Sequence, residues 1–238
     1  MWRSWYDFLQ ALFPFACLLC GCRAGWREVL CRECASSLRK SLATPREVRD
    51  VVSTIPLWTL GAYAGPLAQA VKVAKYRPSR RLAEHLADLM CETLQACAGG
   101  LAGDVVIPVP LHELRESRRG FNQARLLAEG VARAWGCPVS PAIVRQTATR
   151  PQAECDEQER IRNLRGAFQL HPRLEPEHFR NKRIWLIDDV ATTGHTIEES
   201  SLPLRGLGGM NVSALVLAHS YRQCPAAPSV EAETRLSS

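Results

Sequence analysis

Short apolar runs recur along the chain and predict buried strands. The clearest are residues 105–110 (VVIPVP), 184–187 (IWLI) and 212–218 (VSALVLA), with a shorter one at 143–144. Apolar residues at consecutive positions face both sides of a sheet, so such strands are typical of a parallel sheet with both faces covered. The sequence therefore predicts a buried parallel sheet at the centre of the fold.

Helical patterns lie between these runs. Apolar residues recur every three or four positions over residues 81–97 and 123–135, which predicts amphipathic helices. Residues 68–76 have a similar pattern after a turn-like stretch at 60–66, and a further helix is expected from about Ile197. Strands that alternate with helices predict an α/β fold built on a doubly wound parallel sheet.

The composition is that of an ordinary globular chain. Its 238 residues are 46% hydrophobic and 23% charged, and 30 basic against 24 acidic residues give a net charge of +6. A charge this mild allows an anionic ligand or a nucleic acid strand but does not require one. No apolar run approaches the roughly 18 residues of a membrane helix, and Asp7, Gln10 and Pro14 argue against a signal peptide. We expect a cytoplasmic protein without an integral membrane segment.

Ten cysteines are many for such a chain, and four of them have the spacing of a zinc site. Cys17 and Cys20 form one CxxC pair, and Cys31 and Cys34 form another. Each pair turns two thiolates toward one point, so two pairs complete a tetrahedron of sulfurs around a structural Zn²⁺. A closed four-sulfur site is expected to stabilise a small module and not to catalyse. Cys22 could replace Cys20, and a set of free core thiols is the alternative.

The residues after the run at 184–187 predict a site for a phosphorylated sugar. Asp188 and Asp189 follow the run directly, where ligands bind beyond the strand ends of open α/β sheets. The next residues are small or carry hydroxyls and precede a helix, so their backbone N–H groups suit a phosphate. Carboxylates repel phosphate but accept hydrogen bonds from sugar hydroxyls. The alternative, a junction with an Asp N-cap, explains one aspartate but not the pair.

The stretch IWLIDDVATTGHT (184–196) resembles the signature of type I phosphoribosyltransferases, which bind 5-phosphoribosyl diphosphate (PRPP). The resemblance implies that Asp188 and Asp189 are the catalytic pair and face the ribose 2′ and 3′ hydroxyls. It implies that Gly194 lets the backbone approach the 5′ phosphate, which a Cβ would crowd, and that Mg²⁺ binds with PRPP. The residues expected at the phosphate are Val190, Ala191, Thr192, Thr193, Gly194, His195 and Thr196.

Further motifs resemble the ComF family of competence and DNA-utilisation proteins. The matching stretches are residues 75–77 (KYR), 108–124 (PVPLHELRESRRGFNQA) and 152–168 (QAECDEQERIRNLRGAF). With the zinc pairs and the ribose motif, the resemblance covers nearly the whole chain except its tail. Cys155 departs from the pattern, since the family more often has Leu there. The resemblance implies single-stranded DNA and competence-machinery proteins as partners.

Basic residues near the predicted site are candidates to hold the diphosphate of PRPP. Arg118 and Arg119 follow the strand at 105–110, and arginine presents a fork of donors that matches phosphate oxygens. Gly120 would let the backbone approach, and Lys75 ends a predicted helix. The alternatives are a solvated basic turn and an exposed lysine.

The segment at 145–165 corresponds to the mobile loop that covers the active site in similar proteins. It contains Gln152, Arg160 and Asn163, which either hold substrate or anchor the loop itself. His112 and His195 also lie near the predicted site, but neither has a partner that marks it as a base.

The expected organisation has three parts. They are a zinc module over residues 1–45, a type I phosphoribosyltransferase-like domain over 46–222 and a disordered tail over 223–238. Two functions stay open: a Mg²⁺-dependent phosphoribosyltransferase with an unknown acceptor, and a catalytically silent protein that senses PRPP or binds nucleic acid. The sequence has no stripe of basic and aromatic residues that would stack bases.

Overall fold

The computed structural model describes most of the chain between its two ends. The described residues are 16–25, 28–49, 51–77, 79–97, 100–146, 164–205 and 211–220. The predicted tail at 223–238 lies outside them, as do Cys155 and the loop residues Gln152, Arg160 and Asn163.

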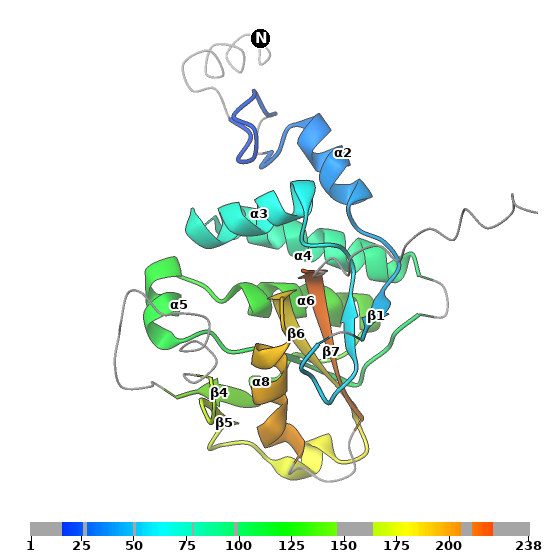
Figure 1. The fold of residues 1–238 in the computed structure, drawn as a ribbon, viewed down its shortest axis with the longest axis vertical. Coiled ribbons are helices and arrows are strands. Elements are labelled where there is room, and N and C mark those ends of the chain that lie inside the picture. The colour runs from blue at the N-terminus through cyan, green and yellow to red at the C-terminus, as the bar shows by residue number, and fades with distance from the viewer. Residues whose placement is uncertain are drawn as a thin grey trace, which may run out of the picture.

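A five-stranded sheet forms the centre of the protein (Figure 1). Its strand order is β1–β2–β7–β6–β3, in which β2, β7, β6 and β3 are parallel and the edge strand β1 is antiparallel to β2. A separate antiparallel pair, β4 and β5, lies beside it. The strands are β1 (Arg46–Val48), β2 (Leu57–Thr59), β3 (Val105–Pro108), β4 (Ile143–Arg145), β5 (Phe168–Leu170), β6 (Arg183–Ala191) and β7 (Asn211–His219).

Helices cover both faces of this sheet, as the apolar runs predict. The helices are α2 (Arg32–Lys40), α3 (Gly65–Tyr76), α4 (Arg80–Gln95), α5 (Glu113–Arg119), α6 (Gln123–Trp135), the 3-10 helix η1 (Pro176–Phe179) and α8 (His195–Arg205). One core lies between the sheet and α3, α4 and α6, and the other lies between the sheet and α8. The doubly wound α/β prediction is confirmed, with the antiparallel edge strand as an addition.

Alternation along β6 explains why two cores form. Ile184 and Leu186 belong to the core under α8, whereas Trp185 and Ile187 belong to the core under α3, α4 and α6. Successive side chains of a strand point to opposite faces, so a continuous apolar run serves both cores at once.

The predicted boundaries differ from the observed ones where tertiary contacts extend or shorten an element. The helix α6 matches its prediction. The helix α3 begins at Gly65, because Pro66 suits the first helical turn although it reads as a turn residue. The strand β3 ends at Pro108. The short elements α2, α5, β1, β2 and β5 were not predicted.

The N-terminal module packs on α3, on the side of this helix that faces away from the sheet (Figure 1). The Gln69 side-chain amide of α3 donates to the backbone oxygen of Leu19 at 2.8 Å, and Arg39 of α2 forms an ion pair with Glu92 of α4. Within the described ranges, no helix is both long and apolar enough to cross a bilayer.

Candidate functional site

The two predicted sugar-binding acids lie inside a strand. The predicted end of this strand at Ile187 was wrong, because β6 pairs with β7 as far as Ala191 and His219. Neighbouring residues of a strand face opposite sides of the sheet, so Asp188 and Asp189 meet different surroundings. The backbone N–H of Asp189 donates to the Asp188 carboxylate at 2.8 Å.

Asp189 faces α3 and pairs there with Lys75. The Lys75 Nζ lies 2.8 Å from Oδ1 of Asp189, and only 25% and 11% of the two side chains are exposed. Burial lowers the pKa of Lys75, but attraction to Asp189 and Asp188 outweighs it and raises that pKa. The structure thus places Lys75, a predicted contact of the diphosphate, next to Asp189, a predicted contact of the ribose. Their ion pair keeps the lysine charged.

Asp188 has a raised pKa, so it is only partly ionised near neutral pH. Burial and then repulsion from the Asp189 carboxylate raise the pKa of Asp188 to about 7, although Lys75 and Arg145 oppose the shift. Part of the side chain still reaches solvent. One carboxylate of the pair is therefore fixed by an ion pair, and the other is poised between its charged and neutral forms.

Arg145 is a site residue that the sequence did not single out. Arg145 stacks over the Phe168 ring at 5.4 Å from its centroid. Burial and repulsion from Arg115 lower the pKa of Arg145, while Asp188 opposes this shift. No local motif marks Arg145, since only the pairing of β4 with β5 brings it toward Asp188.

The loop at 191–196 has the features of an anion cradle. Gly194 is buried with φ +87°, a left-handed conformation that suits glycine. Within the described ranges, the N–H groups of residues 192–194 donate to no other part of the protein. These donors precede α8, so the positive end of its dipole adds to them.

Residues 51–54 contact this loop and the first turn of α8. The Val52 N–H donates to the Thr193 backbone oxygen at 2.8 Å, and the Thr54 N–H donates to the Glu198 carboxylate at 2.8 Å. A Cβ at Gly194 would come within 3.1 Å of the Val51 side chain. Contact with residues 51 and 52 is thus a second reason for glycine, beside the predicted approach to phosphate.

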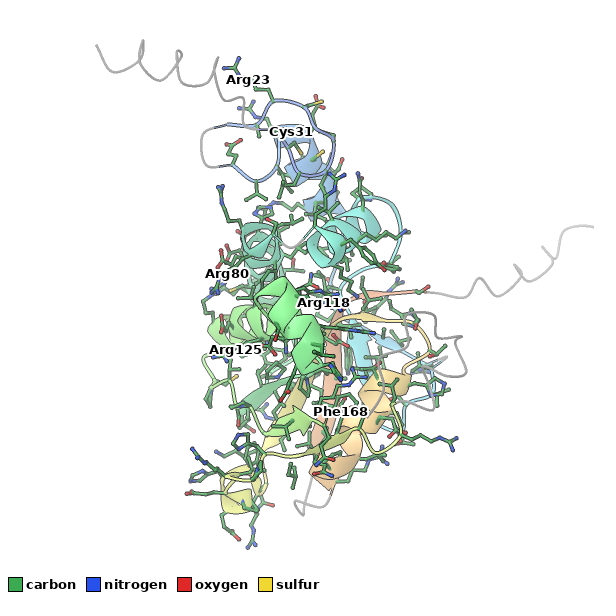
Figure 2. All side chains as sticks on the ribbon, turned by 90° about the vertical axis from the view of Figure 1, so that its left-hand side faces the viewer. Arg23, Cys31, Arg80, Arg118, Arg125 and Phe168 are labelled. Carbon is green, nitrogen blue, oxygen red and sulfur yellow. The ribbon has the colours of Figure 1, made fainter. Side chains whose placement is uncertain are left out.

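The predicted arginines after β3 do not meet the aspartates. They lie on α5, where Arg118 is exposed (Figure 2) and Arg119 donates to the Gln123 side chain at 3.0 Å. In the described part of the chain neither forms an ion pair with Asp188 or Asp189. Gly120 ends α5 with φ +77°, so helix termination accounts for this glycine.

His112 has a structural role. Its Nδ1 accepts a hydrogen bond from the Leu114 N–H at 3.2 Å and thereby caps α5. His195 is the first residue of α8.

The four cysteines of the CxxC pairs come together in the N-terminal module (Figure 2 marks Cys31). Their sulfurs lie within 4.8 Å of one another, and those of Cys20 and Cys31 are 3.7 Å apart. A tetrahedral site with Zn–S bonds of about 2.3 Å has sulfurs about 3.8 Å apart. The donor set therefore fits zinc, and Cys20, not Cys22, belongs to it.

The thiols of this cluster cannot all ionise easily, because neighbouring thiolates repel one another. Burial raises the pKa of Cys17, but hydrogen bonds from the Cys20, Cys31 and Leu19 backbone lower it overall to about 6. Burial and the neighbouring sulfurs raise the pKa of Cys34. A bound cation relieves this kind of repulsion.

Comparison with known proteins identifies relatives across most of the chain, although no protein-family model matches it. The DNA utilization protein YhgH of Escherichia coli O157:H7 is 32% identical over 209 residues, which cover 86% of this chain and 90% of that protein. Competence protein F of Haemophilus influenzae is 37% identical over 118 residues, 49% of this chain and 51% of that protein.

Among solved structures, adenine phosphoribosyltransferase from Leishmania tarentolae matches with a TM-score of 0.38 and 14% identity, over 74% of this chain and 94% of that one. The sequence relatives determine the family, since YhgH is matched over nearly its full length. The chain therefore belongs to the ComF family, which includes these DNA utilization and competence proteins.

Proposed function

We propose that this protein binds PRPP near the carboxyl end of β6 and serves DNA utilisation. The observation that carries the proposal is the Lys75–Asp189 ion pair beside a glycine-containing loop whose N–H groups at 192–194 donate to none of the described residues. A sugar with hydroxyls at one end and a phosphate at the other suits acids and amides arranged in this order.

In this proposal each group of PRPP has a matching part of the site. Asp188 and Asp189 accept hydrogen bonds from the ribose hydroxyls, and the loop at 191–196 donates N–H groups to the 5′ phosphate. Lys75 faces the diphosphate, because its charge persists and its Nζ already lies at the acid pair. Residues 51–54 keep the loop in shape before the ligand arrives, which reduces the ordering cost of binding.

Magnesium would bind here together with PRPP, and the Asp188 and Asp189 carboxylates are the residues that would help to hold it. Mg²⁺ prefers oxygen donors and retains several waters. The neighbouring carboxylates suit this hard cation better than they suit a bare phosphate. When bound, the ion offsets the negative charge that the diphosphate gains on leaving.

The protein's own contribution to transfer would be positioning and charge stabilisation. Lys75 would stabilise the departing diphosphate, and the acid pair would hold the ribose still. The Nδ1 of His112 accepts a hydrogen bond that caps α5, so this nitrogen is not available as a base. Binding without turnover, as in a PRPP sensor, is therefore the second candidate.

Calorimetry with PRPP and Mg²⁺ tests the binding site. Wild-type protein should bind, and Asp189→Asn should bind at least about tenfold more weakly, since it removes a charged acceptor worth about 1.5–3 kcal/mol. Asp88→Asn, an exposed acid on α4, is the matched control and should bind like wild type. Equal affinity in the Asp189 variant would refute the sugar assignment.

A screen of nucleobases and amines for PRPP-dependent release of diphosphate separates the enzyme from the sensor. Release with any acceptor, and its loss in Asp189→Asn, would support a transferase. The proposed DNA role comes from the names of the relatives, and the proposed zinc role is to stabilise the N-terminal module.

A further inference from the structure

Two cations flank the acid pair from opposite faces of the sheet. Lys75 reaches Asp189 from α3, on the side of the core that α3, α4 and α6 cover. Arg145 ends β4, which packs into the other core, the one under α8. Asp188 faces that second side, because it has the same alternation along β6 as Leu186. The acid pair therefore has one cation on each face.

The Arg145 guanidinium is held in one orientation. It stacks over the Phe168 ring at 5.4 Å from its centroid, and β4 pairs Arg145 with Phe168 across the two strands. The side chain is half-buried, and among the described residues no carboxylate forms an ion pair with it. Arginine presents a rigid fork of donors that matches a carboxylate or a phosphate. An oriented fork of this kind suits an anionic ligand, because little freedom is left to lose on binding.

Arg115 adds a second positive charge to this side. It is exposed on α5 and lies near enough that its repulsion lowers the pKa of Arg145. The helix α5 and the β4–β5 pair lie on the same flank of the molecule in both views (Figures 1 and 2). Two guanidinium groups near the single carboxyl of Asp188 leave one positive charge in excess. This excess matches the single charge of a carboxylate better than the two charges of a phosphate.

The Arg145 side is also the side from which an acceptor would arrive. In the function proposed above, the acid pair holds the ribose and Lys75 faces the diphosphate. A direct displacement at the anomeric carbon of a sugar brings the incoming group to the face opposite the leaving group. With the diphosphate toward Lys75 and α3, the incoming group therefore approaches from the face that Arg145 occupies.

We propose that the acceptor is a small nitrogen base or amine with a carboxylate, which Arg145 binds while Arg115 supplies a second positive charge. This inference rests on the proposed phosphoribosyl function and names its class of acceptor. In the transfer, a lone pair on the acceptor nitrogen forms the bond to the anomeric carbon, and the bond from that carbon to the diphosphate oxygen breaks with its electron pair. Diphosphate leaves, and any proton that the nitrogen sheds goes to water. Arg145 binds a group that does not react, so its contribution is positioning and specificity.

Pairs of probes that differ by one carboxylate test the proposal. Nicotinate and nicotinamide, anthranilate and 2-aminobenzamide, and orotate and uracil are each titrated by calorimetry into the full-length protein, with and without PRPP and Mg²⁺, and diphosphate release is followed in parallel. At least one carboxylate should bind about tenfold or more tightly than its neutral partner, since a charge-assisted pair with arginine is lost in the latter.

The variants assign this preference to its residues. Arg145→Gln should abolish it and should weaken PRPP binding much less, whereas Lys75→Met should show the reverse order. Arg115→Gln changes an exposed side chain, so the protein should stay folded and the preference should fall about two- to fivefold. The matched control is Arg125→Gln, which removes an exposed cation from α6 and should behave like wild type.

The outcomes separate this proposal from the preceding one. Release of diphosphate with a carboxylate probe and not with its neutral partner, lost in Arg145→Gln, supports both. Binding of PRPP without any preference for a carboxylate refutes the proposed acceptor class and leaves the phosphoribosyl site standing. Carboxylate binding that depends on Arg145, in protein that does not bind PRPP, supports the anion site and refutes the phosphoribosyl function. If Arg145→Gln weakens PRPP as much as it weakens the carboxylate, the arginine holds the diphosphate and the proposal is wrong.

Discussion

Replacing Asp188 by asparagine should remove a pH dependence from the stability of this protein. The pKa of Asp188 is raised from 3.8 to about 7 by burial and by Asp189. The folded protein therefore holds this proton more tightly than the unfolded chain does, so stability falls as pH rises toward and through about 7. The full shift corresponds to about 4 kcal/mol at about 1.4 kcal/mol per unit. We expect about half of it, because part of the side chain reaches solvent.

Urea unfolding followed by tryptophan fluorescence measures this effect. Between about pH 5 and about pH 8, wild-type protein should lose about 1–2 kcal/mol more stability than Asp188→Asn does. Burial lowers the pKa of His85, which gives the opposite pH trend, but it does so equally in both proteins. Glu129→Gln, which removes an exposed charge on α6, should follow wild type. Parallel stability curves for wild type and Asp188→Asn would refute the buried, proton-holding carboxyl.

Three further changes test other parts of the structure. Lys75→Met should lower the free energy of unfolding in urea by about 2–3 kcal/mol, because it leaves Asp189 unpaired, and adding Asp189→Asn should restore part of the loss. A double variant no more stable than the single one would contradict the pairing. Gly194→Ala should lower the melting temperature more than Gly136→Ala, since both have positive φ but only Gly194 meets neighbouring atoms; equal losses would contradict the contact. Cys34→Ser should reduce bound zinc, measured by atomic emission, and the melting temperature; wild-type zinc content would remove this cysteine from the site.

The amino-acid sequence by itself determined the features that depend on neighbours in the chain. Apolar runs predicted β3, β6 and β7, and helical spacing predicted α6 with its observed bounds. The zinc ligands were predictable because two residues between cysteines already turn both sulfurs the same way. The ribose motif likewise lies within one strand, one loop and the start of one helix.

Only the tertiary structure decided which distant residues meet. β6 extends through both aspartates because β7 continues to pair with it. Lys75 reaches Asp189 because α3 packs across the sheet, and Arg145 approaches Asp188 through the pairing of β4 with β5. These contacts join segments that lie far apart in the chain. They are stabilised by packing and charge compensation between elements, so no local sequence pattern predicts them.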